Sequence, residues 1–403
     1  DSANVTFEAV ARPHWELTKQ SAKGRCLVLG DTTEISFRKN RQIEGLGPTG
    51  NGSGQGFLLH NALLVSAESQ ELIGVAGQTI HYRKKKQRSK KKRESASQMM
   101  KRERESEVWG KVIDQIGKPQ NDEVEYIHVF DRGADNFEVY CRLLQNNGEW
   151  VIRASRMNRY VLDGQEQVQL RDYLPKLEVL GRYSLSLRTR PQQPAREAEL
   201  EVRVGRVKIP RPRHVSPWVR SLEQPPIAIN VIQVVEVNAR KNVKPIQWVL
   251  FTSLPVKTLN DAWTVIGYYE SRWLIEEYHK AIKTGCSTES RQLKAAGRLE
   301  AFVGLTSVLA VRLLQLKTIA RNNPEVPAQR VVPRVWLQML KLSRKKLNRV
   351  HDLTVGQFYR EVAKLGGFLG RKSDGEPGWI TTWRGWEKLN TYVLVASKLN
   401  LDL

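Results

Sequence analysis

The stretch Tyr126-Ile127-His128-Val129-Phe130-Asp131 decides how this chain folds, because an apolar run of strand length ends there in a single acidic residue. A second stretch, Cys26-Leu27-Val28-Leu29-Gly30-Asp31, shows the same pattern nearer the start of the chain. Short continuous apolar runs bounded by polar residues are typical of buried strands. The two stretches therefore predict two buried strands, each followed by an aspartate.

A third acidic residue, Glu276, lies in the middle of a helix predicted over residues 258–284. Two carboxylates on strands and one on a helix can hold a pair of divalent cations, which activate a water or a 3′-hydroxyl for in-line displacement at phosphorus. Asp31, Asp131 and Glu276 are therefore the candidate catalytic and metal-binding residues. Each aspartate also has a structural alternative: Asp31 in an ordinary turn, and Asp131 as a helix N-cap with Asp135 in the first turn. Asp135 is in addition a candidate for supporting the metal ligands.

The predicted helix carries a regular set of polar side chains. Tyr269, Arg272, Glu276, Lys280 and Lys283 follow one another at steps of 3, 4, 4 and 3 residues, so on one continuous helix they share a face. Arginine and lysine on either side of a metal-binding glutamate can contact the phosphates that flank the scissile one, and the tyrosine adds a hydroxyl donor. The alternative is an exposed helix face with ion pairs between Glu276 and its neighbours Arg272 and Lys280.

Composition favours a polyanionic partner. The chain has 403 residues, a net charge of +23 and 40% hydrophobic residues, which predicts two or three domains, a sizeable core and nucleic acid as the commonest partner of this kind. No run of 18 apolar residues occurs, so no membrane partner is expected. The three cysteines are far apart and the histidines are scattered, which argues against disulfides and zinc sites. The first twenty residues are polar and do not resemble a secretory signal, so a cytoplasmic location is expected.

The most basic segment is residues 83–105, which hold twelve lysines and arginines against three glutamates. One interpretation is a solvated loop that contributes nothing specific. The other is a loop that contacts DNA phosphates, and such contacts make affinity fall with rising salt. The sequence leaves both interpretations open.

The order of predicted elements indicates a mixed α/β core. Strands are predicted at 26–30, 57–65 and 72–80, and a helix, a strand, a helix and a strand follow between 106 and 154. Residues 160–250 then change to short alternating runs punctuated by proline and glycine, which predict an inserted antiparallel β module. Helices are predicted at 258–284, 297–321, 333–343 and 354–365. The core is therefore interrupted before its last helix.

These residues resemble those of a known family, the bacterial cut-and-paste DDE transposases of the insertion-sequence-four group, and within it the transposon-five type. The resemblance rests on Asp31-Thr32-Thr33-Glu34-Ile35-Ser36-Phe37, on Asp131-Arg132-Gly133-Ala134-Asp135, and on the family signature Y-(2)-R-(3)-E-(6)-K. Tyr269, Arg272, Glu276 and Lys283 match that signature. Near the C-terminus, Leu365-Gly366-Gly367-Phe368, Gly375-Glu376-Pro377-Gly378 and Trp383-Arg384-Gly385-Trp386 also resemble the family.

The resemblance implies a ribonuclease-H-like mixed sheet core interrupted by an antiparallel β insertion and followed by a helical C-terminal region. The implied domains are the end of a truncated N-terminal region at 1–24, the catalytic core at 25–158 and 248–320, the insertion at 159–247 and a dimerisation region at 321–403. It further implies two Mg²⁺ or Mn²⁺ ions at Asp31, Asp131 and Glu276, and a homodimer in a synaptic complex with transposon ends and target DNA. The expected location is the bacterial cytoplasm, at the nucleoid.

The implied reaction nicks one strand at the transposon end, forms and opens a hairpin, and joins the end to target DNA. Hairpin formation moves a base out of the stack. By resemblance Trp248 stacks on that base, and Arg153 and Trp273 line the same pocket; an indole gives a stacking face that tolerates any base. Taken without the resemblance, Trp248 in its apolar strand is better explained by core packing.

Relatives carry roughly a further domain before the first aspartate, so the sequence is expected to lack much of the region that recognises transposon ends. This leaves a non-catalytic inhibitor of transposition that acts by dimerisation as the main alternative to an active transposase. A stand-alone metal nuclease is a third possibility, but it gives the pocket around Trp248 no role.

Overall fold

The computed structural model describes residues 4–38, 40–41, 43–84, 105–187, 195–239, 243, 245–347 and 350–399. Most of the basic segment at 83–105 lies outside the described residues. The chain forms two compact units. The central unit comprises Trp15–Thr33 and Leu58–Ile275, and the C-terminal unit comprises Asp1–His14, Glu34–Phe57 and Glu276–Leu403.

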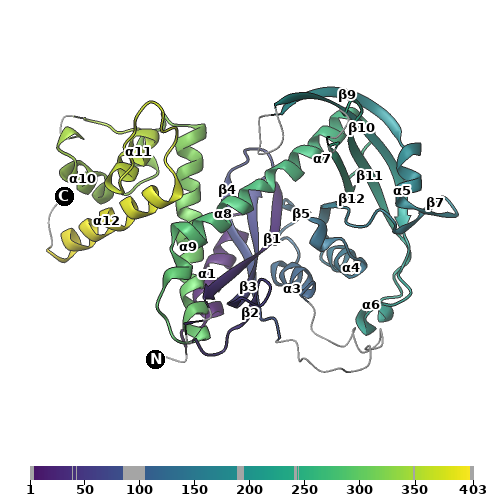
Figure 1. Ribbon diagram of the computed structural model, residues 1–403, viewed down its shortest axis with the longest axis horizontal. Helices are drawn as coiled ribbons and strands as arrows, with labels where there is room; N and C mark the ends of the chain where they lie inside the picture. Colours follow the sequence, from purple (N-terminus) through teal and green to yellow (C-terminus); the bar gives the residue numbers. More distant parts are fainter. Residues whose placement is uncertain are drawn as a thin grey trace. The chain divides into compact units, whose positions relative to one another are not determined.

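The strands form a large mixed sheet (Figure 1). Hydrogen-bonded neighbours follow the order β2-β3-β1-β5-β6-β12-β11-β10-β7-β8, with β4 beside β3 and β9 beside β10. The strands are β1 (Arg25–Arg38), β2 (Gly47–Thr49), β3 (Gly54–Ser66), β4 (Leu72–His81), β5 (Glu125–Phe130), β6 (Glu149–Arg153), β7 (Tyr160–Asp163), β8 (Glu166–Gln169), β9 (Glu178–Leu187), β10 (Arg196–Ile209), β11 (Ile227–Glu236) and β12 (Gln247–Thr252).

Three neighbouring strands, β1, β5 and β6, run parallel. Parallel strands are covered on both faces, which requires apolar side chains in succession rather than in alternation. The apolar runs Cys26–Leu29 and Tyr126–Phe130 meet this requirement, and their side chains are buried. The two strands predicted from these runs are confirmed.

The antiparallel module predicted within 160–250 is confirmed as strands, and it extends the same sheet. β10 and β11 pair antiparallel from Leu200 opposite Glu236 to Ile209 opposite Ile227. β11 then pairs with β12, and β12 pairs antiparallel with β6. The sheet therefore continues without a break from the parallel strands into the module.

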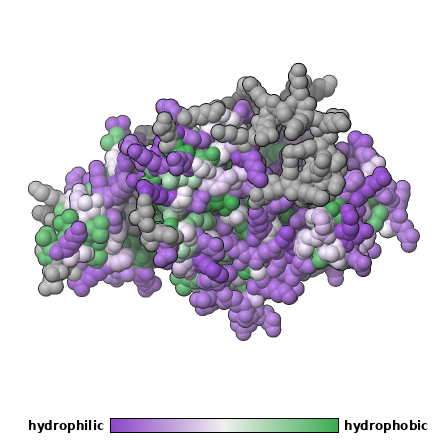
Figure 2. All heavy atoms as spheres, turned by 90° about the horizontal axis from the view of Figure 1, so that it is seen from below, coloured by the Kyte–Doolittle hydropathy of each residue, from purple (hydrophilic) through white to green (hydrophobic). Residues whose placement is uncertain are grey.

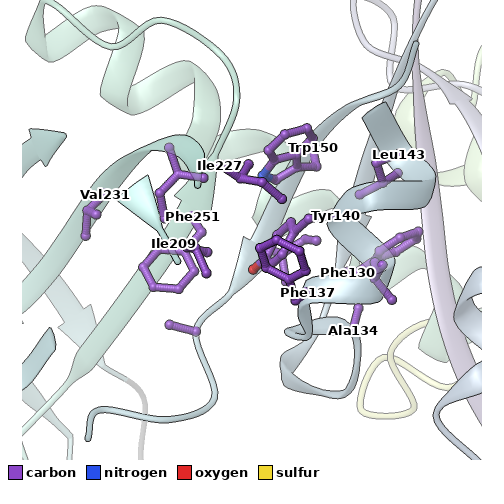
Figure 3. Close-up of a cluster of buried hydrophobic side chains, with 14 of the residues drawn as sticks. Phe130, Ala134, Phe137, Tyr140, Leu143, Trp150, Ile209, Ile227, Val231 and Phe251 are labelled. Atoms are coloured by element: carbon purple, nitrogen blue, oxygen red, sulfur yellow. The ribbon is translucent and has the colours of Figure 1, made fainter. Parts of the chain in front are cut away.

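The helices of the central unit are α3 (Glu107–Ile116), α4 (Phe137–Gln145), α5 (Leu170–Tyr173), α6 (Pro217–Ser221) and α7 (Leu259–Ser271), and short 3₁₀ turns occur at Arg132–Ala134 and Leu174–Lys176. α3 and α4 lie side by side. One aromatic cluster joins α4 to strands β5, β6, β10, β11 and β12 (Figure 3). Its drawn members include Phe130, Phe137, Tyr140, Trp150, Ile209 and Phe251. The module strands therefore share a core with the parallel strands.

The C-terminal unit is mainly helical. Its helices are α9 (Ala296–Asn322), α10 (Arg334–Ser343), α11 (Val355–Leu365) and α12 (Trp379–Lys398). α1 (Phe7–Gln20) and α8 (Trp273–Lys280) cross the boundary between the units, and a π-helix, Ala281–Gly285, follows α8. The helices predicted at 297–321, 333–343 and 354–365 are confirmed, whereas α1 and α12 were not predicted. Within the described chain α9 is long and apolar enough to cross a membrane, but 61% of its apolar window is buried, as in the core helix of a soluble domain.

Two glycines let α11 and α12 pack backbone against backbone. A Cβ atom on Gly385 of α12 would lie 1.7 Å from the carbonyl oxygen of Val362, and one on Gly366 would lie 1.8 Å from that of Thr381. No side chain fits either position without moving the helices apart. Both glycines belong to the C-terminal stretches that carry the resemblance.

Candidate active site

The sheet brings Asp31 and Asp131 side by side. β1 and β5 are parallel, with Gly30 opposite Phe130, so the next residue on each strand is the aspartate. Neighbouring strands are about 4.8 Å apart, which places the two carboxylates within reach of shared ligands. A Cβ atom on Gly30 would lie 2.4 Å from the ring of Phe130, so glycine is needed where the strands meet. The two strands predicted from the apolar runs are therefore neighbours in the sheet, which the sequence alone did not predict.

The alternative of a turn at Asp31 is wrong. β1 continues through this residue to Arg38, because β3 pairs along the other edge of β1. The alternative that Asp131 is an N-cap is confirmed, but it caps a short 3₁₀ turn and not an α-helix. Its Oδ1 accepts a hydrogen bond of 2.7 Å from the amide of Gly133 and caps the 3₁₀ turn Arg132–Ala134. Among the described residues, Oδ2 of Asp131 has no hydrogen-bond partner, so capping leaves one oxygen available to a ligand.

Asp31 already bears a cationic partner. Nη1 of Arg272 donates to Oδ2 of Asp31 at 3.0 Å, while Oδ1 accepts from the amide of Thr32 at 2.7 Å. The side chains of Arg272 and Asp31 are only 17% and 20% exposed, so the ion pair is shielded from solvent. The carboxylate of Asp31, next to Asp131, is therefore already bound to the positive charge of Arg272.

The prediction of one continuous helix over 258–284 is wrong, because the helix is interrupted at Arg272. α7 ends at Ser271, α8 begins at Trp273, and the hydrogen bonds around Arg272 span three residues rather than four. Beyond α8 the π-helix lengthens each turn, so Lys283 does not continue the regular 3.6-residue spacing. The side chains expected to form one stripe are thus distributed over two helices and a π-turn.

Glu276 is helical, as predicted, and lies half-buried on α8. Lys280 is exposed and donates to Glu277 at 2.9 Å. Burial opposes ionisation of Glu277, but hydrogen bonds from Lys317 and Lys280 outweigh it and lower its pKa to about 2. No group of three or more His, Cys, Asp or Glu side chains in the described ranges is arranged to hold a metal ion. The sheet brings Asp31 and Asp131 together. Glu276 lies four residues after Arg272, which pairs with Asp31.

Trp248 lies beside the core rather than within it. Its neighbours Val249 and Phe251 face the aromatic cluster, so Trp248 and Leu250 project from the opposite face of β12. Arg153 is paired opposite Leu250 and shares that face. On this side the half-buried indole lies 6.4 Å, centroid to centroid, from the ring of Tyr269 on α7.

Two further predicted residues have contrasting environments. Tyr269 is buried, and its ring lies 6.0 Å from the guanidinium carbon of Arg272. It therefore packs between Arg272 and Trp248 instead of presenting an open face to DNA. Trp273 is 58% exposed, which is unusual for an indole and compatible with a surface that contacts a partner.

Comparison with protein-family models decides what kind of protein carries this geometry. Residues 25–312 match the family described as the transposase DDE domain. The chain belongs to the DDE transposases. Residues 308–399 match the transposase Tn5 dimerisation domain, so this is a Tn5-like DDE transposase, an enzyme of DNA recombination. The dimerisation match points to a homodimer, and neither match favours the inhibitor alternative.

Asp135 has a structural role in this transposase. Its buried carboxylate accepts from the hydroxyl of Tyr140 at 2.8 Å, from the amide and hydroxyl of Ser155 at 2.7 and 2.9 Å, and from Arg159 at 2.6 Å. Burial and the nearby carboxylate raise the pKa of Tyr140 well above its usual value. These bonds tie the turn after Asp131 to the chain that follows β6. Asp135 therefore fixes the backbone that carries Asp131.

The sequence did not reveal a polar cavity next to this turn. The cavity has a volume of about 360 Å³, and its charged and titratable lining residues are Arg132, Arg142, Arg156 and His214 together with Glu107, Asp135 and Glu138. Arg142 pairs with Asp114 and Glu138, whereas Arg132, Arg156 and His214 have no carboxylate partner among the described residues. They come from separate parts of the sequence, so no local motif could have indicated that they gather beside Asp131.

Proposed function

We propose that this chain is a cut-and-paste DDE transposase of the insertion-sequence-four group. In this proposal Asp31, Asp131 and Glu276 are the catalytic carboxylates. The observation that carries the proposal is the adjacent placement of Asp31 and Asp131 on parallel strands, with Arg272 already supplying positive charge to one of them. The family match supports the transposase class, and the carboxylate positions support the assignment of the active site.

The donor set suits Mg²⁺ or Mn²⁺, two ions per active site. These hard cations take oxygen ligands, mainly carboxylates and water. Oδ2 of Asp131 has no protein partner in the described chain, and Oδ2 of Asp31 binds a guanidinium, which is a positive group of the kind that a metal ion would replace. When bound, the two ions would activate the attacking oxygen and stabilise the leaving one.

The substrates of the proposed reaction are the transposon end and the target duplex. The protein nicks one strand, a hairpin forms, and after its opening the end is joined to target DNA. Trp248 offers a stacking face to a displaced base, with Arg153 on the same face of the sheet and Trp273 exposed on α8. Arg272, Lys280 and Lys283, together with the hydroxyl of Tyr269, contact the backbone phosphates in this proposal.

The proposed domain division follows the same function. Residues 25–158 and 248–320 form a ribonuclease-H-like core, 159–247 form the β insertion, and 321–403 form the dimerisation region. A homodimer is supported by apolar side chains left exposed on α12, namely Ile380, Tyr392, Leu394 and Val395. Figure 2 shows a mainly hydrophilic face with scattered hydrophobic atoms. The proposed location is the bacterial cytoplasm, at the nucleoid.

The test uses a labelled DNA end that is already nicked, incubated with Mg²⁺. Glu276→Gln is compared with Glu270→Gln, which removes an exposed carboxylate from the neighbouring helix α7. The parent and Glu270→Gln are expected to form a hairpin, and Glu276→Gln is expected to form none while it still binds DNA. Hairpin formation by Glu276→Gln at the parental rate would refute the assignment. No product from a folded parent that associates with an active transposase would favour an inhibitor.

A further inference from the structure

Glu277, the residue after Glu276, is held by three side chains of the C-terminal unit. Its Oε1 accepts from Nζ of Lys280 at 2.9 Å. Its Oε2 accepts from Nζ of Lys317 on α9 and from Nε1 of Trp379, the first residue of α12, at 3.3 Å. The ammonium of Lys317 also lies 4.2 Å from the centroid of the Trp379 indole. The three groups Glu277, Lys317 and Trp379 are called the α8 clamp below.

The α8 clamp is charged and centres on a buried lysine, with Glu277 and Trp379 half-buried around it, which makes its geometry specific. Lys317 is 6% exposed and belongs to an otherwise apolar stretch of α9. A buried ammonium is costly unless it is paired and hydrogen-bonded, and Glu277 supplies both. Tyr278 adds a second attachment of α8 to α9, because its buried hydroxyl donates to the carbonyl of Ser307 at 3.4 Å. This turn of α8 therefore has little freedom to rotate.

The clamp joins the two regions that the family comparison distinguishes. Glu277 lies in the DDE-domain match at 25–312, whereas Lys317 and Trp379 lie in the dimerisation match at 308–399. Successive residues on an α-helix point about 100° apart, so fixing the Glu277 side chain fixes the direction of its neighbour Glu276. If the contact between α8 and α9 served packing alone, it would require neither the ion pair between Glu277 and Lys317 nor the hydrogen bond from the indole of Trp379.

We propose that the α8 clamp is a positioning device through which the dimerisation region sets the orientation of Glu276. Glu277, Lys317 and Trp379 act through Glu276 and do not touch the substrate. The inference rests on the proposed catalytic role of Glu276. Its consequence is that loosening the clamp weakens the hold of the protein on divalent cations before it weakens the dimer.

The variants separate charge from packing. Trp379→Phe keeps an aromatic ring for Lys317 and removes only the indole N–H donor. Lys317→Met keeps the length of the side chain and leaves the half-buried Glu277 without the cation that binds its Oε2. The double variant Glu277→Gln/Lys317→Met removes both charges, so that no half-buried carboxylate is left without its partner on α9. Arg312→Met, on an exposed part of the same helix, is the matched control.

The measurement is Mn²⁺ binding by calorimetry on the full chain, together with the Mn²⁺ concentration that gives half-maximal hairpin formation on a nicked DNA end. Lys317→Met is expected to raise that concentration about tenfold, as the loss of one charge-assisted hydrogen bond would. Trp379→Phe is expected to raise it less, the double variant to recover part of the loss, and Arg312→Met to match the parent. Thermal unfolding and sedimentation report folding and dimer content in parallel.

Three outcomes separate this inference from the proposed function. If Glu276→Gln abolishes hairpin formation and every clamp variant keeps the parental Mn²⁺ dependence, the catalytic assignment stands and the clamp is only structural. The clamp is likewise only structural if activity falls in step with unfolding while the Mn²⁺ affinity of the folded fraction is unchanged. If Glu276→Gln itself remains active, the proposed function fails, and with it the clamp as a device acting through Glu276.

Discussion

Replacing Arg272 with methionine tests whether its guanidinium occupies the place of a metal ion at Asp31. Methionine retains an unbranched side chain of similar reach and removes the charge. The deleted contact is a 3.0 Å hydrogen bond between side chains that are 17% and 20% exposed. A hydrogen bond to a charged group contributes about 1.5–3 kcal/mol, and this pair is shielded enough to lie within that range. Without metal, the Arg272→Met protein is therefore expected to be less stable by about that amount.

The free energy lost with the Arg272–Asp31 contact should make the Arg272→Met protein bind metal more tightly than the parent. In the parent a divalent cation must displace the guanidinium from Oδ2 of Asp31, whereas in Arg272→Met this guanidinium no longer competes for that oxygen. Since 1.4 kcal/mol corresponds to a tenfold change in affinity, the variant is expected to bind Mn²⁺ about tenfold more tightly or better. Calorimetry without DNA measures this directly, because the lost phosphate contact then plays no part. Thermal unfolding with EDTA and with Mn²⁺ should show a larger metal-induced rise in Tm for the variant than for the parent.

Arg25→Met is the matched control. Arg25 also begins from β1 and pairs with an acid of β5, Glu125, at 2.7 Å, but at the opposite end of the paired strands from Asp31. Its loss should lower stability slightly and leave Mn²⁺ affinity unchanged. The reasoning is refuted if Arg272→Met is destabilised in EDTA yet binds Mn²⁺ with the parental affinity, because the guanidinium would then not compete with a metal.

Two other substitutions test the base-stacking residue and the packing of the dimerisation region. Trp248→Ala should slow hairpin formation more than the first nick, with Trp248→Phe intermediate, because only hairpin formation needs a displaced base to stack; equal slowing of both steps in a single-turnover assay would assign the indole to packing. Gly385→Ala places a Cβ atom 1.7 Å from the carbonyl oxygen of Val362, so a cost of about 1–3 kcal/mol and a loss of dimer are expected in thermal unfolding and sedimentation. Gly297→Ala, whose Cβ meets nothing within 4 Å, should be neutral, and an equal effect of both substitutions would show that helix contact is not the cause.

The part of the site that could be predicted from sequence is the part set by local physics. Asp31 and Asp131 follow apolar runs, and buried parallel strands need such runs, so both positions can be identified without knowledge of the sheet. α12 was missed for the opposite reason. Several of its buried positions are small or polar, among them Thr382 and Gly385, because α11 approaches its backbone too closely for large side chains. A helix that buries its backbone does not show the usual apolar periodicity.

The predicted single helix at 258–284 fails at Arg272, and long-range contacts explain why sequence could not show it. Spacing alone placed Arg272 on one stripe with Glu276. The structure ends α7 before Arg272 and pairs its side chain with Asp31, which is distant in sequence. A pattern of side chains at helical intervals is compatible both with a continuous helix and with two helices in succession. Only the contact of Arg272 with Asp31 on β1 distinguishes the two arrangements.

Lys317 carries a signal in the sequence that points to its partner. A lysine in the apolar stretch Leu313–Ala320 must either reach solvent or find an acidic partner, because an unpaired buried ammonium is too costly to keep. That reasoning predicts a carboxylate near α9 but does not identify which. Glu276 and Glu277 are adjacent and chemically equivalent in sequence, and only the rotation of α8 assigns the second to Lys317. The contact that holds Glu277 on α9 thus separates the two acids, one for the clamp and the other for the proposed metal site.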